Sequence, residues 1–333
     1  MRVLITGGAG FIGSHLAARY IEQGDHVTVI DDLSTGSYDN IVQLMNLPNF
    51  NFAIETILNE TVMDRLVSEC SLIVHLAAAV GVELVIGDPV HTIETNVLGT
   101  YVVLKTANRY RKKVILISTS EIYGEGVNES FKEDDFRLLG PITQSRWSYS
   151  CTKELDEFLG LAYFKQKELP IVICRLFNTI GPRQTGHYGM VVPRFVNQAL
   201  NGEPVTVYGD GSQSRCFCNV NDVLDGINII STAPKAEGEV YNLGSHEEIT
   251  ITDLARKVIE VTGSSSEIVY IPYEQAYTEG FSDMKRRKPD IRKMIETFQW
   301  QPRYTLEETL SLIVEYELQL RAETLSTSSQ GST

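Results

Sequence analysis

The sequence predicts an α/β protein with a doubly wound parallel sheet and a smaller mixed α/β domain for substrate. In the first half, short apolar runs such as RVLIT, HVTVID and VILIS alternate with helical patterns, as in right-handed βαβ units. Beyond about residue 180, Gly and Pro become denser, which indicates a less regular part. We expect a nucleotide-binding domain over 1–178, joined again by segments near 215–245, a substrate domain over 179–320 and a disordered tail over 321–333.

The individual elements follow from hydrophobic periodicity. Strands are expected at uninterrupted apolar runs, and helices where apolar residues recur with a helical period between those runs. The predicted strands cover 2–6, 26–31, 72–77 and 114–118, and the helices begin near residue 14 and cover 60–67 and 96–107. The tail LSTSSQGST is polar and has no periodicity, which is typical of disorder.

Charge limits the classes of partner. The chain has 333 residues and a net charge of −14, which argues against a nucleic-acid-binding protein because such a protein shows a basic patch. The most apolar stretch, 72–87, is interrupted by His75 and Glu83 and is too short to span a bilayer. The opening MRVLITGG runs directly into a strand and a glycine turn, so we expect neither a secretory leader nor a membrane partner.

Cysteine usage predicts a reducing compartment, the cytoplasm. The five cysteines are an odd number without the spacing of a disulfide framework. Cys216 and Cys218 form a CxC pair, but no second pair or nearby histidine completes a zinc site. We therefore expect these two to pack in the core and no metal to be bound.

A nucleotide site is predicted where TGGAGFIG joins the first strand to the first helix. Gly7, Gly10 and Gly13 allow a tight turn and a close approach of the backbone to a pyrophosphate at a helix N-terminus, as in Rossmann-type domains. The second strand ends in Asp31 and Asp32, where an acid binds the adenosine ribose hydroxyls and repels a 2′-phosphate. The predicted cofactor is NAD rather than NADP.

A tyrosine and a lysine four residues apart form the predicted catalytic pair. On one helical face, the lysine lowers the pKa of the tyrosine so that the phenolate serves as a base. The chain has three such pairs, Tyr101/Lys105, Tyr149/Lys153 and Tyr163/Lys167. Tyr149 and Lys153 follow the hydroxyl-rich strand end STSEIYG after a loop, whereas Tyr101 precedes it and Tyr163 lies two helical repeats beyond Tyr149. We therefore favour the Tyr149/Lys153 pair.

These motifs together resemble the extended short-chain dehydrogenase/reductase superfamily, in its nucleotide-sugar branch. The resemblance covers about residues 1–320 and rests on TGGAGFIGSH, HLAA, TNVLGT, STSEIYG, YSCTK, RLFNTIGPR, VYGDGSQSR and RRKPDI. One departure follows the third strand, where IETI stands in place of the Gly-Asp pair that many relatives carry near the adenine. The resemblance also implies cofactor contacts by Phe11, Ile12, Ala77 and Asn96, and a homodimer formed through helices near 92–108 and 149–167.

The triplet Thr119-Ser120-Glu121 distinguishes the branches. It is similar to that of the UDP-glucuronate decarboxylases, whereas 4,6-dehydratases carry an Asp-Glu pair after the threonine. The resemblance implies that Thr119 holds the sugar C4 hydroxyl while Tyr149 takes its proton. Oxidation at C4 of a uronate creates a β-keto acid that loses CO₂, so no acid is needed at Ser120, and a charge there is unfavourable beside the substrate carboxylate. Glu121 is expected to position the ring or to manage the C5 proton.

The remaining site residues are implied by the same resemblance. Arg287 matches an arginine of the decarboxylase site, and the others are expected to bind the UDP-sugar: Asn178, Arg183, Val191, Arg194, Tyr208 and Arg215. Arginine forks suit a diphosphate.

The predicted function is decarboxylation of UDP-glucuronate to UDP-xylose or the UDP-4-keto-pentose. The alternative is a UDP-glucuronate or other UDP-sugar 4-epimerase. A catalytically silent NAD-binding sensor is a third interpretation, disfavoured because the Tyr149/Lys153 pair is kept.

Overall fold

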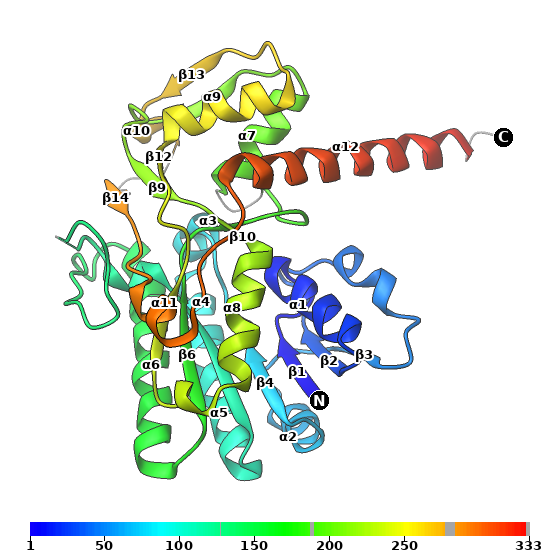
Figure 1. Cartoon of the computed structure of the whole chain (residues 1–333), viewed down its shortest axis with the longest axis vertical. Coiled ribbons are helices and arrows are strands. Elements are labelled where there is room, and N and C mark those ends of the chain that lie inside the picture. The colour runs from blue at the N-terminus through cyan, green and yellow to red at the C-terminus, as the bar shows by residue number, and fades with distance from the viewer. Residues whose placement is uncertain (127, 187–189, 277–283, 331–333) are drawn as a thin grey trace.

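The computed structural model describes residues 1–126, 128–186, 190–276 and 284–330, and its centre is a seven-stranded parallel sheet (Figure 1). The predicted α/β fold with a doubly wound sheet is confirmed. The strand order is β11 (Val240–Leu243), β6 (Ile171–Leu176), β5 (Lys113–Thr119), β4 (Leu72–His75), β1 (Arg2–Thr6), β2 (His26–Asp31) and β3 (Phe50–Ile54). The order reverses between β1 and β4, so the carboxyl ends of these two strands open a crevice for a ligand.

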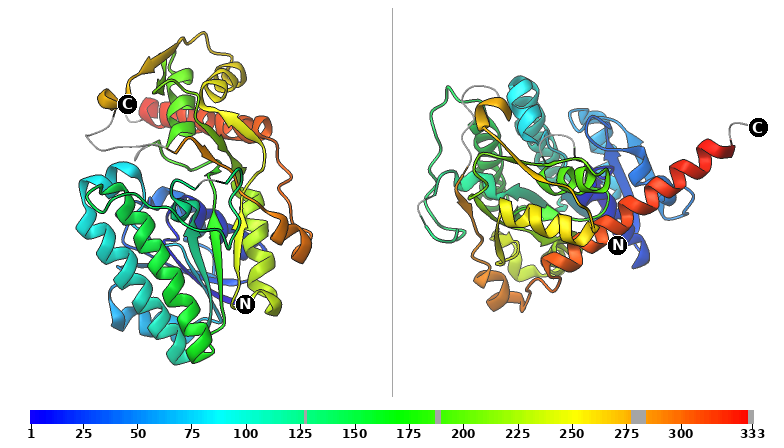
Figure 2. Two further views of the ribbon diagram at one scale, coloured as in Figure 1. Left: turned by 90° about the vertical axis from the view of Figure 1, so that its left-hand side faces the viewer. Right: turned by 90° about the horizontal axis from the view of Figure 1, so that it is seen from above.

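Helices cover both faces of this sheet because its strands are apolar on both sides. On one face, α1 (Phe11–Glu22) and α8 (Val220–Thr232) pack in a core with Val3 and Ile5. The other face carries the intervening Leu4, with α2 (Glu60–Glu69), α5 (Gly99–Tyr110) and α6 (Arg146–Lys167). Figure 2 shows α5 and α6 side by side at the outer edge. Short helical segments link β4 to α5: α3 (Val82–Gly87), α4 (Pro89–Ile93) and η3 (Glu94–Leu98).

A second core lies above the carboxyl ends of the sheet strands. It joins Phe195 of α7 (Val191–Leu200), Leu254 of α9 (Ile251–Thr262) and Leu310 of α12 (Leu306–Gln330). Small sheets complete this part: β13 (Ile268–Ile271) pairs with β8 (Val205–Tyr208), β9 (Ser214–Cys216) lies between β12 (Glu248–Thr250) and β14 (Arg286–Arg287), and β10 (Cys218–Asn219) pairs with β7 (Thr179–Ile180). The remaining helices are α10 (Tyr273–Ala276) and α11 (Arg292–Phe298).

The expected disordered tail is corrected over most of its length. Helix α12 runs from Leu306 to Gln330, so 321–330 have a helical backbone, and 331–333 lie outside the described residues. Leu310 and Ile313 are buried and anchor the start of this helix. Once a turn is anchored, each further residue adds a hydrogen bond without a new nucleation cost, so helix extends into a polar sequence.

Candidate active site

One large cavity lies at the crevice between the sheet and the second core. Its volume is about 530 Å³, in the range of small-molecule sites. The structure brings these predicted residues to it: Gly7, Gly10, Phe11, Ile12, Gly13, Asp31, Asp32, Ala77, Thr119, Ser120, Glu121, Tyr149, Lys153, Asn178, Val191, Arg194, Tyr208, Arg215 and Arg287. Residues from Gly7 to Arg287, which are far apart in sequence, therefore line the same cavity.

The glycine turn forms the cofactor end of this cavity. Gly7 has φ of +70°, and a Cβ there would lie 2.7 Å from the backbone nitrogen of Ala77, so only glycine fits. Helix α1 then begins at Phe11, and its first N–H groups suit an anion. The Asp31 carboxylate accepts hydrogen bonds from the backbone N–H groups of Ala9 and Leu33, each at 2.9 Å. Burial raises the pKa of Asp31, although these bonds oppose the shift.

The hydroxyl end of β5 meets the N-terminal part of α6. Thr119 ends β5, and its hydroxyl hydrogen-bonds the Tyr149 hydroxyl. Burial raises the pKa of Tyr149, and the Glu121 carboxylate raises it further, so the unliganded protein holds this phenol protonated. Lys153 lies one helical turn beyond Tyr149 on the same face, with 3% of its side chain exposed.

Glu121 lies between two arginines. Its Oε1 is 2.5 Å from Arg287 Nη2, and its Oε2 is 3.7 Å from Arg146 Nη2. Burial alone would raise the pKa of Glu121, but the two guanidinium groups outweigh it and hold the pKa below its usual range. Arg287 is in register with Arg215 on the neighbouring strand β9, which adds a third positive charge. The carboxylate at this end of the cavity is therefore ionised and surrounded by cations.

Buried polar residues lie behind Lys153. Its Nζ is 3.0 Å from an Asp156 carboxylate oxygen. His75 is hydrogen-bonded to Thr100 at 3.0 Å and to Thr6 at 2.8 Å. Burial lowers the pKa of His75 to about 3, so the ring is neutral. The Thr6–His75–Thr100 hydrogen bonds thus join β1 and β4 to α5.

Two predicted contact residues lie away from the cavity wall. Asn96 is buried behind it, where its side chain bonds both Ala79 backbone groups and the Thr152 hydroxyl. Arg183 contacts the Ser14 hydroxyl at 3.5 Å and does not line the cavity. Asn96 thus helps to position Ala79, a residue of the cavity wall.

The alternative tyrosine–lysine pairs are also outside the cavity. Tyr101 is 43% exposed, and Lys105 forms an ion pair with Glu60 at 2.8 Å. Tyr163 packs against the core beneath α2, α5 and α6. Tyr149/Lys153 is the one of the three pairs that lines the cavity.

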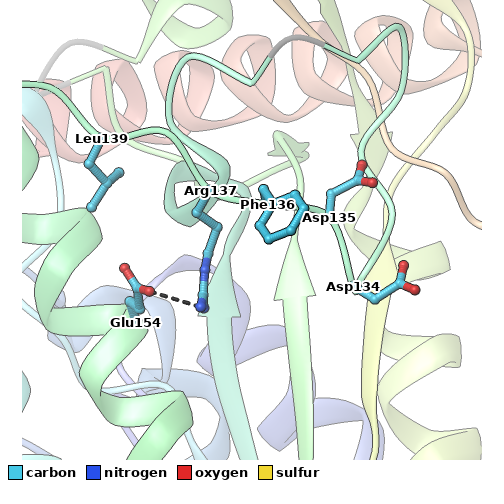
Figure 3. A pocket seen from close by; sticks show the side chains of 6 residues that line it. All are labelled: Asp134, Asp135, Phe136, Arg137, Leu139 and Glu154. Atoms are coloured by element: carbon cyan, nitrogen blue, oxygen red, sulfur yellow. Dashed lines mark ion pairs between the residues drawn. The ribbon is translucent and has the colours of Figure 1, made fainter.

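A separate surface hollow lies outside this site, beside α6 (Figure 3). In it, Arg137 forms an ion pair with Glu154 at 3.0 Å and stacks on Phe158. Arg137 thus contacts a glutamate and an aromatic ring, and it lines this surface hollow instead of the large cavity.

Sequence reasoning missed Arg146 and Asp156. Each had a spacing signal, because Arg146 stands one helical turn before Tyr149 and Asp156 three residues after Lys153. Burial in the fold was needed to separate these two from the charged residues that face solvent on α6.

The doubly wound sheet, the glycine turn and the Tyr149–Lys153 pair define an extended short-chain dehydrogenase/reductase of the nucleotide-sugar branch. The chain belongs to the GDP-mannose 4,6 dehydratase family, which it matches over residues 4–313.

Similar proteins carry two kinds of name. The chain is 41% identical over 317 residues to UDP-N-acetyl-alpha-D-glucosaminuronate decarboxylase of Bacillus cytotoxicus, covering 95% of this chain and 97% of that protein. It is 36% identical to UDP-glucuronic acid decarboxylase 1 of Danio rerio, covering 95% and 72%. Among solved structures, UDP-glucuronic acid 4-epimerase of Bacillus cereus, in complex with UDP-glucuronic acid and NAD, is 31% identical with a TM-score of 0.87, covering 96% and 100%.

Proposed function

We propose that this enzyme catalyses the NAD-dependent decarboxylation of UDP-glucuronate through a 4-keto intermediate, giving UDP-xylose or the UDP-4-keto-pentose. The observation that carries the proposal is the ionised Glu121, held between Arg287 and Arg146 in the cavity that Thr119 and Tyr149 also line. An acidic substrate suits this cationic surrounding.

The residues at the glycine turn fit NAD. The turn has no room for a Cβ at Gly7, and Asp31 and Asp32 line the cavity at the end of β2. Gly10 and the first turn of α1 would hold the pyrophosphate, and the two acids would meet the ribose and disfavour a 2′-phosphate. When bound, NAD supplies an acceptor for the hydride that leaves C4 of the sugar. In its reduced form it supplies a donor that can return a hydride to the sugar.

The chain's own residues manage protons and charge. Tyr149 is protonated in the unliganded protein, so it acts as the base for the C4 hydroxyl only after it has lost its own proton. Thr119 orients that hydroxyl. The resulting β-keto acid breaks its C5–carboxyl bond, CO₂ departs, and the electron pair of that bond enters an enolate. A proton then adds at C5, a step that Glu121 supports by placing the ring. Ser120 is neutral and 1% exposed, so it adds no charge beside the departing carboxylate.

A 4-epimerase is the second candidate. It is favoured by the likeness to the Bacillus cereus 4-epimerase, which shares the fold over nearly the whole chain. Such an enzyme would retain the carboxylate and return hydride to the other face of the keto sugar. The name of the Bacillus cytotoxicus relative adds a 2-acetamido uronate as a second possible substrate for decarboxylation.

One experiment separates these candidates. The protein is incubated with NAD and either UDP-glucuronate or UDP-N-acetylglucosaminuronate, while released CO₂ is measured and the sugar products are followed by NMR. We expect CO₂ and a pentose product. A UDP-galacturonate product without CO₂ contradicts decarboxylation and supports the epimerase.

We also propose a homodimer formed through α5 and α6. These adjacent helices and the segment before them carry exposed apolar side chains: Leu98 at 50%, Tyr101 at 43%, Leu155 at 50% and Phe158 at 56%. A contiguous apolar surface favours pairing with a second copy.

We keep the cytoplasm as the proposed location because all five cysteines are free. None of the described helices is long and apolar enough to cross a membrane.

A further inference from the structure

Arg146 occupies a specific place relative to the reacting carbon. It is the first residue of α6, and Tyr149 follows three residues later on the same helical face. Tyr149 and Thr119 mark the C4 hydroxyl of the proposed substrate, and the carboxylate of a hexuronate is attached to C5, the neighbouring ring atom. Arg146 therefore lies on the cavity wall one helical turn from the base.

Glu121 lies among three arginines at this end of the cavity. Among the described residues that line it there, Arg146, Arg215 and Arg287 carry positive charge and Glu121 carries negative charge. Arg146 Nη2 and Glu121 Oε2 are 3.7 Å apart, within ion-pair distance. Arg287 Nε is buried and has no hydrogen-bond partner among the described residues.

The guanidinium of Arg146 is held in place before substrate arrives. Its side chain is 9% exposed, and it stacks on the Trp147 ring at 4.9 Å from the ring centroid. Trp147 is itself buried and donates from Nε1 to Gln144 at 3.1 Å. A fixed and partly desolvated arginine recognises a carboxylate at low entropic cost.

We propose that Arg146 binds the carboxylate of the hexuronate ring and thereby selects a nucleotide uronate over the neutral nucleotide hexose. The inference rests on the proposed function only for the class of substrate, a nucleotide uronate, and holds whether the keto intermediate loses CO₂ or is epimerised. Arg146 is thus a specificity-determining residue.

The test measures binding of UDP-glucuronate, UDP-glucose and UDP by calorimetry to the NAD-loaded protein. All variants carry Tyr149→Phe, so the sugar is not oxidised during the titration. Arg146→Gln is expected to weaken UDP-glucuronate about 10- to 100-fold, because it removes a charged partner from a desolvated anion. Affinity for UDP-glucose and UDP is expected to stay within about twofold, since neither carries that carboxylate.

Two further variants make the result interpretable. Arg137→Gln removes an arginine with the same kinds of partner, a glutamate and an aromatic ring, but outside the cavity, and is expected to change none of the three affinities. Arg146→Lys keeps the charge and is expected to restore part of the preference for UDP-glucuronate, and it replaces Arg146→Gln if that variant does not fold.

The role of Arg146 and the proposed function can be refuted by different results. If Arg146→Gln weakens UDP-glucuronate and UDP-glucose equally, or weakens neither, Arg146 only holds Glu121 and the inference is overturned. Where Arg146→Lys stands in for that variant, equal weakening of the two ligands overturns the inference. The unmodified protein can then still release CO₂ from UDP-glucuronate. If the unmodified protein binds UDP-glucose as tightly as UDP-glucuronate, the nucleotide-uronate class is wrong and the inference falls with it.

Discussion

Replacing Asp156 by asparagine is expected to affect both stability and the pH dependence of the first chemical step. Asp156 lies 3.0 Å from Lys153 Nζ, and the two side chains are 1% and 3% exposed. Removing one partner of a buried ion pair costs about 3–5 kcal/mol of unfolding free energy, because the other charge stays buried without compensation. That loss is a large share of the roughly 5–15 kcal/mol that typically holds a folded protein together.

The pH effect has a definite sign. The Asp156 carboxylate is one of the groups that raise the pKa of Tyr149, after burial and Glu121. Without it the pKa of Tyr149 falls, the phenolate forms at lower pH, and the rising limb of the pH–rate profile moves to lower pH. The assay is single-turnover NADH formation with UDP-glucuronate across pH, paired with urea unfolding followed by circular dichroism.

Glu157→Gln provides a matched control from the same helix. Glu157 is 3% exposed and its carboxylate is held by Arg175, with Nη2 at 2.7 Å, about two helical turns beyond Tyr149 along α6. We expect a similar loss of stability without movement of the pH–rate profile. A profile of Asp156→Asn that stays in place or moves to higher pH refutes the reasoning, as does a stability loss under about 1 kcal/mol, the range of exposed pairs.

Three other predictions concern catalysis, cofactor choice and assembly. The Glu121→Gln variant is expected to reduce NAD⁺ in a single turnover but to release CO₂ about 10²- to 10⁴-fold more slowly. The Tyr149→Phe variant is expected to give no NADH. Unchanged CO₂ release by Glu121→Gln contradicts a role for Glu121 after oxidation at C4. Asp31→Ala is expected to weaken NAD binding and improve tolerance of NADP in titrations of both cofactors, and equal affinities in the unmodified protein count against the assignment. Light scattering at micromolar concentration is expected to give a dimer, and Phe158→Glu on the exposed face of α6 a monomer; a monomeric unmodified protein rejects this interface.

Much of the fold was predictable because its signals are local. The alternation of apolar runs with helical patterns identified the sheet, and the glycine turn and the Tyr149/Lys153 pair lie at the carboxyl ends of its strands as expected. The helical extension of α12 past residue 320 was not predictable from its polar composition, since its anchor is the burial of Leu310 against α7 and α9. Propagation from an anchored turn leaves no hydrophobic pattern in the residues it reaches.

The site was predictable in its residue types but not in its charge balance. Glu121 could be identified from STSEIYG, but its position between Arg146 and Arg287 depends on segments that are far apart in sequence. Asn96 could be identified from its motif, but its hydrogen bonds to Ala79 on the cavity wall become apparent only in the folded chain. Long-range pairing of charged side chains has no periodic signature, so it emerges only when the chain is folded.

The position of β11 at the edge of the sheet has a consequence for synthesis on the ribosome. β6 ends at Leu176, and the strand that covers its free edge begins only at Val240. The interval of 240 − 176 = 64 residues takes roughly 3–13 s at about 5–20 residues per second. Throughout that time a nascent chain carries an apolar strand with unpaired backbone groups, which can pair with a neighbouring chain on the same messenger. The β6 edge of the sheet therefore depends on a segment that is synthesised later for its backbone pairing.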